Sequence, residues 1–282
     1  MDKSNFKDVV KDYKVVFFDA YGVLKNSSGL IPGIEGTFNY LKEHNIDYYI
    51  LTNDASRGPK SLAQYYIDEG LTSVTHDKII SSGMLATEYL RLKVKHGTVA
   101  YLGTGESAHY LQDSGLQTLP ISNMDVNDVK HVNALVFLDD EGFDWHHDIP
   151  KMVNLLMKRN IPSIVANTDK SYPVSDKEVG IAIGSIANMV EDITGRNFIK
   201  FGKPDAQMFI FAYEHCQKAK EVGRESILMV GDTLFTDIMG GNKFGIDTAL
   251  VLTGNTLPEN ASDRIKQFGI IPDYVCDSAV ID

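Results

Sequence analysis

The sequence predicts an α/β fold with a largely parallel sheet, because short apolar runs alternate with stretches of helical periodicity. Polar residues at the ends of several runs support the same fold. The expected strands are Val15–Phe18, Tyr48–Leu51, Lys78–Ser81, Val99–Leu102, Ala134–Leu138, Ser163–Ala166, Ile227–Val230 and Thr248–Val251. The expected helices are Gly36–His44, Pro59–Glu69, Leu85–Leu92, Ile149–Arg159, Ile186–Thr194 and Pro204–Lys218, the last with proline at its first position.

Three of the expected strands end in polar residues. Val15–Phe18 is followed by Asp19, Tyr48–Leu51 by Thr52 and Asn53, and Ile227–Val230 by Gly231 and Asp232. Ligands of open α/β sheets bind outside the carboxyl ends of the strands. We therefore expect these side chains to face one crevice.

Composition narrows the class of protein. The chain has 282 residues, of which 43% are hydrophobic and 10% aromatic, enough for a large core. A formal net charge of −11 argues against non-specific binding to nucleic acid or to an anionic membrane. The two cysteines, Cys216 and Cys276, form no disulfide framework, and the first residues show no apolar signal segment. A cytoplasmic globular protein is expected.

Two acids follow the strand Ile227–Val230. Asp232 comes directly after it and Asp237 five positions later, where a helical pattern begins. Together with Asp19 they would form the oxygen-rich pocket that Mg²⁺ prefers, with a few carboxylates plus water and phosphate oxygens. Taken singly, Asp237 fits a helix N-cap and Asp232 a turn equally well.

Neutral and cationic donors accompany the acids. Thr52 and Asn53 offer a hydroxyl and an amide that suit a transferring phosphoryl group, although the segment also reads as an ordinary turn. Lys203 would neutralise phosphate charge near Asp19. A lysine alone is usually a solvated surface residue.

Four motifs in this order resemble those of the haloacid dehalogenase-like (HAD) superfamily: FFDAYGV at 17–23, LTND at 51–54, GKPD at 202–205 and GDTLFTD at 231–237. The resemblance implies a Rossmann-like core in which Asp19 is the nucleophile and Thr52 and Lys203 bind phosphate. It also implies a metal held by Asp19, Asp232, Asp237 and the backbone carbonyl of Tyr21. Further segments look like the NagD and pyridoxal-phosphate phosphatase branch: SSGMLATEYL, VAYLGTGE, FDWHHD and GSIANMVEDITGR.

An inserted domain explains the spacing of the motifs. Thr52 and Lys203 lie 151 positions apart, whereas a βαβ unit needs about 30 residues. The resemblance implies an inserted α/β cap at 87–197, with the core formed by 1–86 and 198–282. In that branch the cap covers the active site and relatives often pair through it, so a homodimer is expected.

The candidate substrate contacts come from the expected cap and from the segment that follows the strand Tyr48–Leu51. Asp169, Lys170 and Tyr172 lie in NTDKSYP, after the strand Ser163–Ala166, where relatives keep a loop that faces the substrate. A plain solvent loop fits this segment as well. Asn53 and Asp54 complete the candidate set.

Tyr21 departs from the family pattern. The phosphatases of the family carry an aspartate two positions after the nucleophile, which protonates the leaving oxygen and then activates water. Such acid–base help contributes about 10²–10⁴-fold, and a phenol is a poor base at neutral pH. The acid would be Tyr21, another nearby acid such as Asp54, or none.

Three functions remain open. The first is Mg²⁺-dependent hydrolysis of a small, sugar-phosphate-like monoester through an aspartyl phosphate on Asp19. The second is a catalytically weak phosphate-ester binding protein. The third is a metal-independent 2-haloacid dehalogenase, whose members also carry an aromatic residue after the nucleophile. Asp232 and Asp237 would repel the anionic substrate and product of a dehalogenase, so they favour phosphoryl transfer.

Overall fold

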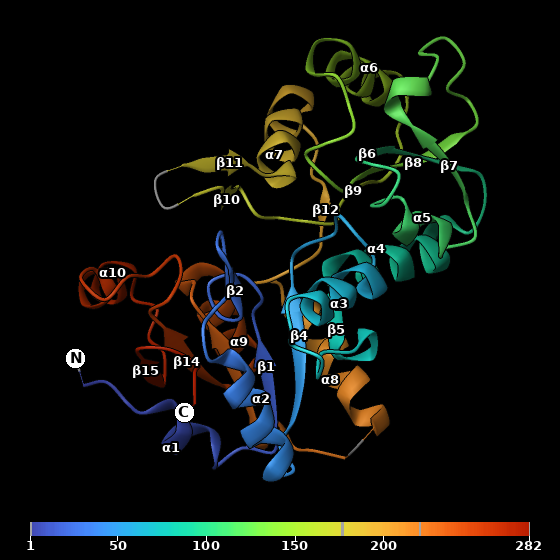
Figure 1. The fold of residues 1–282 in the computed structure, drawn as a ribbon. Helices are drawn as coiled ribbons and strands as arrows, with labels where there is room; N and C mark the ends of the chain where they lie inside the picture. Colours follow the sequence, from blue (N-terminus) through green and yellow to red (C-terminus); the bar gives the residue numbers. More distant parts are fainter. Residues whose placement is uncertain (1, 176–177, 220, 282) are drawn as a thin grey trace. The chain divides into compact units, whose positions relative to one another are not determined.

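The computed structural model describes residues 2–175, 178–219 and 221–281, which form two compact units (Figure 1). The first unit contains the described residues of Met1–Thr52, Pro59–Ile80 and Lys203–Asp282. The second contains Asn53–Gly58 and Ser81–Gly202. It therefore includes the whole insertion predicted at 87–197, a few residues beyond each end of it, and the short segment that follows Thr52.

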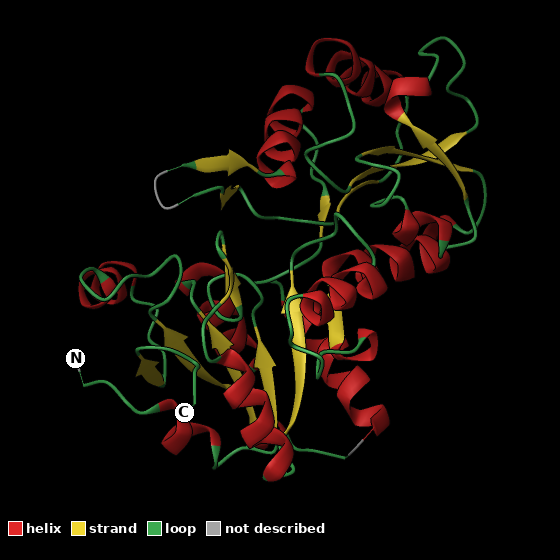
Figure 2. Ribbon diagram, in the orientation of Figure 1, coloured by secondary structure: helices red, strands yellow, loops and turns green. Residues whose placement is uncertain are grey.

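A six-stranded sheet forms the centre of the first unit, with the strand order β15-β14-β13-β1-β4-β5 (Figure 2). The pairs from β15 to β4 are parallel. Because β1 lies between β13 and β4, the strand order reverses beside it, which is where open α/β sheets bind ligands. The strands are β1 (Val15–Phe18), β4 (Asp47–Thr52), β5 (Ile79–Ser81), β13 (Ile227–Gly231), β14 (Asp247–Val251) and β15 (Tyr274–Cys276).

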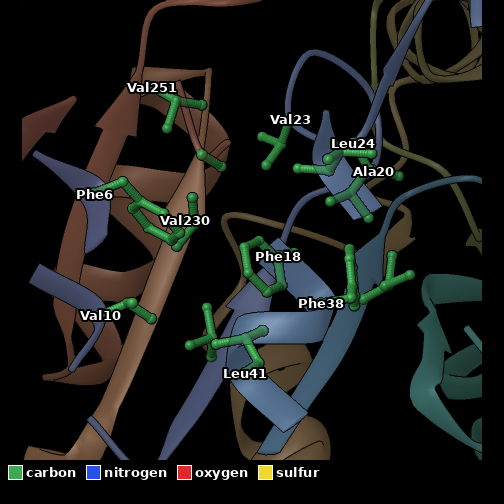
Figure 3. Packing of buried hydrophobic residues seen from close by; sticks show 14 of the residues in the cluster. Phe6, Val10, Phe18, Ala20, Val23, Leu24, Phe38, Leu41, Val230 and Val251 are labelled. Atoms are coloured by element: carbon green, nitrogen blue, oxygen red, sulfur yellow. The ribbon is translucent and has the colours of Figure 1, made fainter. Parts of the chain in front are cut away.

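Helices cover both faces of this sheet. Phe18 and Val230 on one face pack against Phe38 and Leu41 of α2 (Figure 3). Residues of α1 and α3 join this apolar cluster. On the other face, Leu250 of β14 packs with Ala261 of α10. The helices of the unit are α1 (Phe6–Val10), α2 (Ile34–Glu43), α3 (Pro59–Asp68), α8 (Ala206–Ala219), α9 (Met239–Phe244) and α10 (Ala261–Phe268).

Every residue of β1 and β13 is buried. Sheets with helices on both faces bury their central strands completely, which explains why these strands are continuous apolar runs without polar alternation. A short hairpin, β2 (Lys25–Asn26) and β3 (Gly29–Leu30), follows β1, and a π-helical turn, η5 (Leu234–Ile238), leads into α9.

The second unit has its own parallel sheet, with the order β12-β9-β8-β6-β7. Helices α6 and α7 cover one face through an apolar cluster with Leu102, Phe137 and Val165. Its helices are α4 (Ser82–Tyr89), α5 (His109–Gln112), α6 (Trp145–Lys158) and α7 (Ile183–Thr194). Its strands are β6 (Thr98–Leu102), β7 (Gln117–Pro120), β8 (Val132–Phe137), β9 (Ser163–Val165), β12 (Ile199–Lys200) and the antiparallel hairpin β10 (Ser171–Pro173) and β11 (Val179–Ile181).

The predicted α/β class with parallel sheets and an inserted α/β segment is confirmed. Several helix starts are wrong. Helix α8 begins at Ala206, not at Pro204, because the Asp205 carboxylate caps the Gln207 amide at 2.9 Å. Helix α6 begins at Trp145, not at Ile149, because Asp144 accepts the His147 amide. None of the described helices is both long enough and apolar enough to cross a membrane.

Candidate active site

Polar residues at the carboxyl ends of β1, β4 and β13 lie at one edge of the core sheet. The Asp19 amide donates to the Val230 carbonyl at 2.8 Å, which extends the pairing of β1 with β13 by one residue. Thr52 is the last residue of β4, the neighbour of β1 on its other side, and Asp232 follows β13 directly. Since these strands are parallel, their carboxyl ends bring Asp19, Thr52 and Asp232 to the same edge.

Lys203 lies among the acids. Its Nζ donates to Asp19 Oδ1 at 2.5 Å and to Asp237 Oδ1 at 2.7 Å, and the side chain is only 2% exposed. Burial lowers the pKa of Lys203, but the two carboxylates outweigh burial and raise the pKa above its ordinary value. The lysine therefore stays protonated at neutral pH and holds Asp19 in a fixed orientation.

Three carboxylates share this edge. Ligand oxygens of Asp19, Asp232 and Asp237 all lie within 4.8 Å of one another, and the last two residues are fully buried. Burial, followed by the charge of Asp19, raises the pKa of both Asp232 and Asp237. When all three acids are ionised, they and the Lys203 ammonium carry a net charge of minus two.

This donor set fits a divalent cation. A hard cation that takes oxygen ligands would cancel the remaining charge and lower the cost of keeping buried carboxylates ionised. Asp19, Asp232 and Asp237 are the side chains that would hold Mg²⁺, and the resemblance adds the carbonyl of Tyr21.

The Asp232 carboxylate lies in a cradle formed by Gly22, Gly254 and two hydrogen-bond donors. The sequence analysis did not predict this arrangement. Asp232 Oδ2 accepts the Asn255 amide at 2.5 Å, and Oδ1 accepts the Thr233 hydroxyl at 2.8 Å. A Cβ on Gly22 or on Gly254 would lie 2.1 Å or 1.9 Å from Asp232 Oδ2, and Gly22 also has a φ of +80°. Only glycine fits either position. The glycines in the segments DAYG and LTGN were the available signal.

Tyr21 lies in the loop between β1 and β2, where it is half-buried. Its backbone forms an isolated bridge with Lys25. The loop holds Tyr21 two residues after Asp19, at the position where the family resemblance implies an acid.

The remaining candidates belong to the second unit. Asn53 Nδ2 donates to Asp169 Oδ1 at 2.9 Å, which joins two residues that the sequence singled out separately. Asp54 accepts the amide and hydroxyl of Ser56 at 2.8 and 2.6 Å, which is the turn chemistry that the sequence also allowed.

Tyr172 and Lys170 follow in the same unit. The Tyr172 hydroxyl donates to Asp140 Oδ2 at 3.0 Å. Lys170 is exposed, and its carbonyl accepts the Ala182 amide and the Ser185 hydroxyl. The structure therefore joins Asn53 with Asp169 and ties Tyr172 to the end of β8.

Comparison with known proteins assigns the chain to a class. A family model described as haloacid dehalogenase-like hydrolase matches residues 16–117, and a second, HAD-hydrolase-like, matches residues 200–280. The two matches flank the centre of the inserted unit and include all four motifs.

Individual relatives match over nearly the whole chain. A crystal structure described as a possible sugar phosphatase of the HAD superfamily, from Cytophaga hutchinsonii, is 58% identical, with a TM-score of 0.96 and coverage of 100% of this chain and 99% of that one. Chronophin from Bos taurus is 28% identical and is covered to 93%, with 96% of this chain aligned. Phosphoglycolate phosphatase 2 from Arabidopsis thaliana is 28% identical over 97% of this chain and 93% of its own length.

The fold and site define an α/β protein that gathers three carboxylates and a lysine at the carboxyl edge of a parallel sheet. The chain belongs to the haloacid dehalogenase-like hydrolases, in the NagD-like branch that its motifs resemble.

Proposed function

We propose that the protein hydrolyses a small phosphate monoester with Mg²⁺ through an aspartyl phosphate on Asp19. The observation that carries the proposal is the buried Lys203, which bonds both Asp19 and Asp237 within a cluster of three carboxylates. Relatives named sugar phosphatase and phosphoglycolate phosphatase support the substrate class.

Each residue of the site has its own role in the proposed reaction. The Asp19 carboxylate attacks phosphorus, the ester oxygen leaves with a proton, and water then hydrolyses the aspartyl phosphate. Lys203 orients Asp19 through a charge-assisted hydrogen bond and offsets phosphoryl charge. The Thr52 hydroxyl donates to a phosphoryl oxygen, and the Tyr21 hydroxyl supplies the proton to the leaving group. When bound, Mg²⁺ neutralises charge on the phosphoryl oxygens.

The first experiment tests the nucleophile. Asp19→Asn keeps the shape of the side chain but removes the attacking carboxylate, so phosphate release from p-nitrophenyl phosphate with Mg²⁺ should fall by at least about 10³-fold. The matched control is Asp12→Asn, an exposed acid on the same segment, which should retain wild-type activity. Wild-type rates in Asp19→Asn would sink the assignment.

A phosphate-ester binding protein is the second candidate, because Tyr21 replaces the acid of the related phosphatases. It predicts measurable affinity for phosphate esters in calorimetry but no turnover across a panel of monoesters. The carboxylate cluster disfavours the third function, dehalogenation, since three acids would repel a haloacid anion. Release of chloride from 2-chloropropionate without metal would support dehalogenation and contradict the proposed phosphatase function.

A further inference from the structure

The loop that carries Tyr21 is closed by the backbone of Lys25. The Gly22 amide donates to the Lys25 carbonyl at 2.7 Å, and the Lys25 amide donates to the Ala20 carbonyl at 3.2 Å. The Leu24 amide donates to the same Ala20 carbonyl at 3.0 Å. Tyr21 therefore lies inside a ring of backbone hydrogen bonds that ends at Lys25, and the placement of Lys25 sets the placement of this loop.

The side chain of Lys25 rests on α3. Its Nζ lies 4.6 Å from the ring centroid of Tyr65 and 5.9 Å from that of Tyr66. Both rings belong to α3, and Tyr66 is buried in the core cluster. An ammonium within about 6 Å of an aromatic face is attracted by the ring quadrupole. The loop is thus attached, through one cation, to a helix that is itself anchored in the core.

The turn of the hairpin also lies close to the end of α3, and the base of the loop is packed in the core. At its turn, Gly29 has a φ of +114°, and a Cβ there would meet Glu69 Oε2, one residue past α3, at 3.3 Å. Val23 and Leu24 are buried in the core cluster at the base of the loop (Figure 3). Apolar packing therefore holds the base, while Lys25 holds strand β2 against α3.

We propose that Lys25 is a positioning residue for the reaction: its ammonium, held over Tyr65 and Tyr66, fixes the loop that places Tyr21 beside Asp19. The proposal deepens the proposed function and rests on it, since it gives Tyr21 the proton that the leaving group takes. A proton donor must stay within hydrogen-bond reach of its target, so a loosely held Tyr21 would protonate the leaving oxygen less often.

The test uses variants that separate charge from packing. Lys25→Met keeps the alkyl stem and removes the charge, Lys25→Arg keeps a cation that also stacks on aromatic rings, and Tyr65→Leu removes the partner. The matched control is Lys60→Met, which removes an exposed cation from the same helix.

Hydrogen exchange of peptides that contain residues 20–26 gives a readout that needs no substrate. Exchange should be about 3- to 10-fold faster in Lys25→Met and in Tyr65→Leu, as expected for the loss of a partly exposed cation–π contact. Lys25→Arg and Lys60→Met should exchange at the wild-type rate. Unchanged exchange in Lys25→Met would overturn the proposal.

Kinetics then show whether the loop acts through Tyr21. Lys25→Met should lower kcat for an alkyl phosphate by about 10-fold more than kcat for p-nitrophenyl phosphate, because only the poor leaving group needs the proton. KM should stay nearly constant, and Lys25→Arg should restore the ratio. In a Tyr21→Phe background the Lys25→Met change should have no further effect on the ratio.

Other kinetic outcomes contradict the proposal. A higher KM at constant kcat would make Lys25 a substrate contact, and an equal loss on both esters would make it a general structural residue. If the wild-type protein hydrolyses neither ester, the proposed function fails, whereas the exchange experiment still decides whether Lys25 fixes the loop.

Discussion

Tyr21 stands two residues after Asp19, at the position where the family resemblance implies an aspartate. Lys203 bonds Asp19 within the cluster of three acids, and Thr52 ends the neighbouring strand β4. A phenol at position 21 can donate a proton to a leaving group but is poorly suited to activate water. Because a phenol is also a weaker acid than the carboxyl group of the family pattern, the first step, which expels the leaving group, should suffer most when that group is an alkoxide.

Replacing Tyr21 with aspartate tests this reasoning. Tyr21→Asp restores a carboxylate of the related phosphatases and should raise kcat by about 10- to 100-fold for alkyl phosphates, with a smaller gain for p-nitrophenyl phosphate. Steady-state kinetics on both esters measure the change. The control is Tyr21→Asn, because asparagine has a volume similar to that of aspartate but no titratable group. This variant should show no gain in kcat. Equal gains on both esters would mean that another residue already supplies the proton.

The cradle around Asp232 requires glycine at two positions, and this requirement cannot be recognised from either position alone in the sequence. Gly22 and Gly254 are distant in the chain, yet both must lack a Cβ because the Asp232 carboxylate passes between them. The Thr253 hydroxyl donates to the Gly22 carbonyl at 2.6 Å and ties the two segments together. Each glycine alone reads as an ordinary turn residue, so only the folded chain reveals their shared role.

At the scale of elements, the segment that follows β8 in the second unit contains a buried acid, Asp139. Its surroundings disfavour the ionised form of the carboxyl group. Burial, together with nearby Asp140, raises the pKa of Asp139 to about 6. The Thr104 hydroxyl lies 3.4 Å from Asp139 Oδ2 and compensates only weakly. Because an unfolded aspartate ionises near pH 4, the folded unit binds this proton more tightly than the unfolded chain between about pH 4 and pH 6.

This difference predicts a pH dependence of stability. The contribution of Asp139 to the free energy of unfolding should be lost as pH rises through that window, since the folded state must then bury a charge. Asp139→Asn should raise that free energy by about 1–2 kcal/mol at pH 7.5 and have little effect at pH 4. Thermal melts at the two pH values measure it, and Asp192→Asn, an exposed acid on α7, is the control. A stabilisation that is the same at both pH values would contradict this account.

The central strands of both sheets were predicted from the sequence, whereas the edge strands β7, β12 and β15 and the two hairpins were missed. Strands β1 and β13 are continuous apolar runs, because helices cover both faces of their sheet. The two-residue strands β2, β3 and β12 have no periodicity to detect, and only tertiary pairing defines them. The helix starts at Trp145 and Ala206 depend on the capping aspartates Asp144 and Asp205, which sequence reasoning overlooked.

At the scale of the whole molecule, the hairpin of β10 and β11 offers a surface for a second copy of this chain. Val179 and Ile181 on β11 are 72% and 65% exposed. Among the described strands, β11 pairs with β10 alone, so its other edge presents backbone donors and acceptors. Exposed apolar edge strands readily pair with another chain. We propose that the protein forms a homodimer through this hairpin.

Light scattering coupled to size-exclusion chromatography checks the proposal. The wild-type chain should elute as a dimer at micromolar concentration, and Ile181→Asp should shift it to a monomer because the new charge would be buried in the interface. Ile271→Asp, a change at a similarly exposed residue of the first unit, should leave the dimer intact. A wild-type monomer, or a dimer in Ile181→Asp, would refute pairing through β11.

The sequence by itself determined the fold class, the order of the four motifs and the presence of an inserted unit. These follow from local signals, namely apolar runs, the polar residues that end them, and the distance between Thr52 and Lys203. Only the tertiary structure decided how far Asp232 and Asp237 are buried, which glycines enclose Asp232, and that Lys25 reaches α3 from the loop of Tyr21. Contacts between residues far apart in the chain depend on how the elements pack, and no local pattern in the sequence encodes that packing.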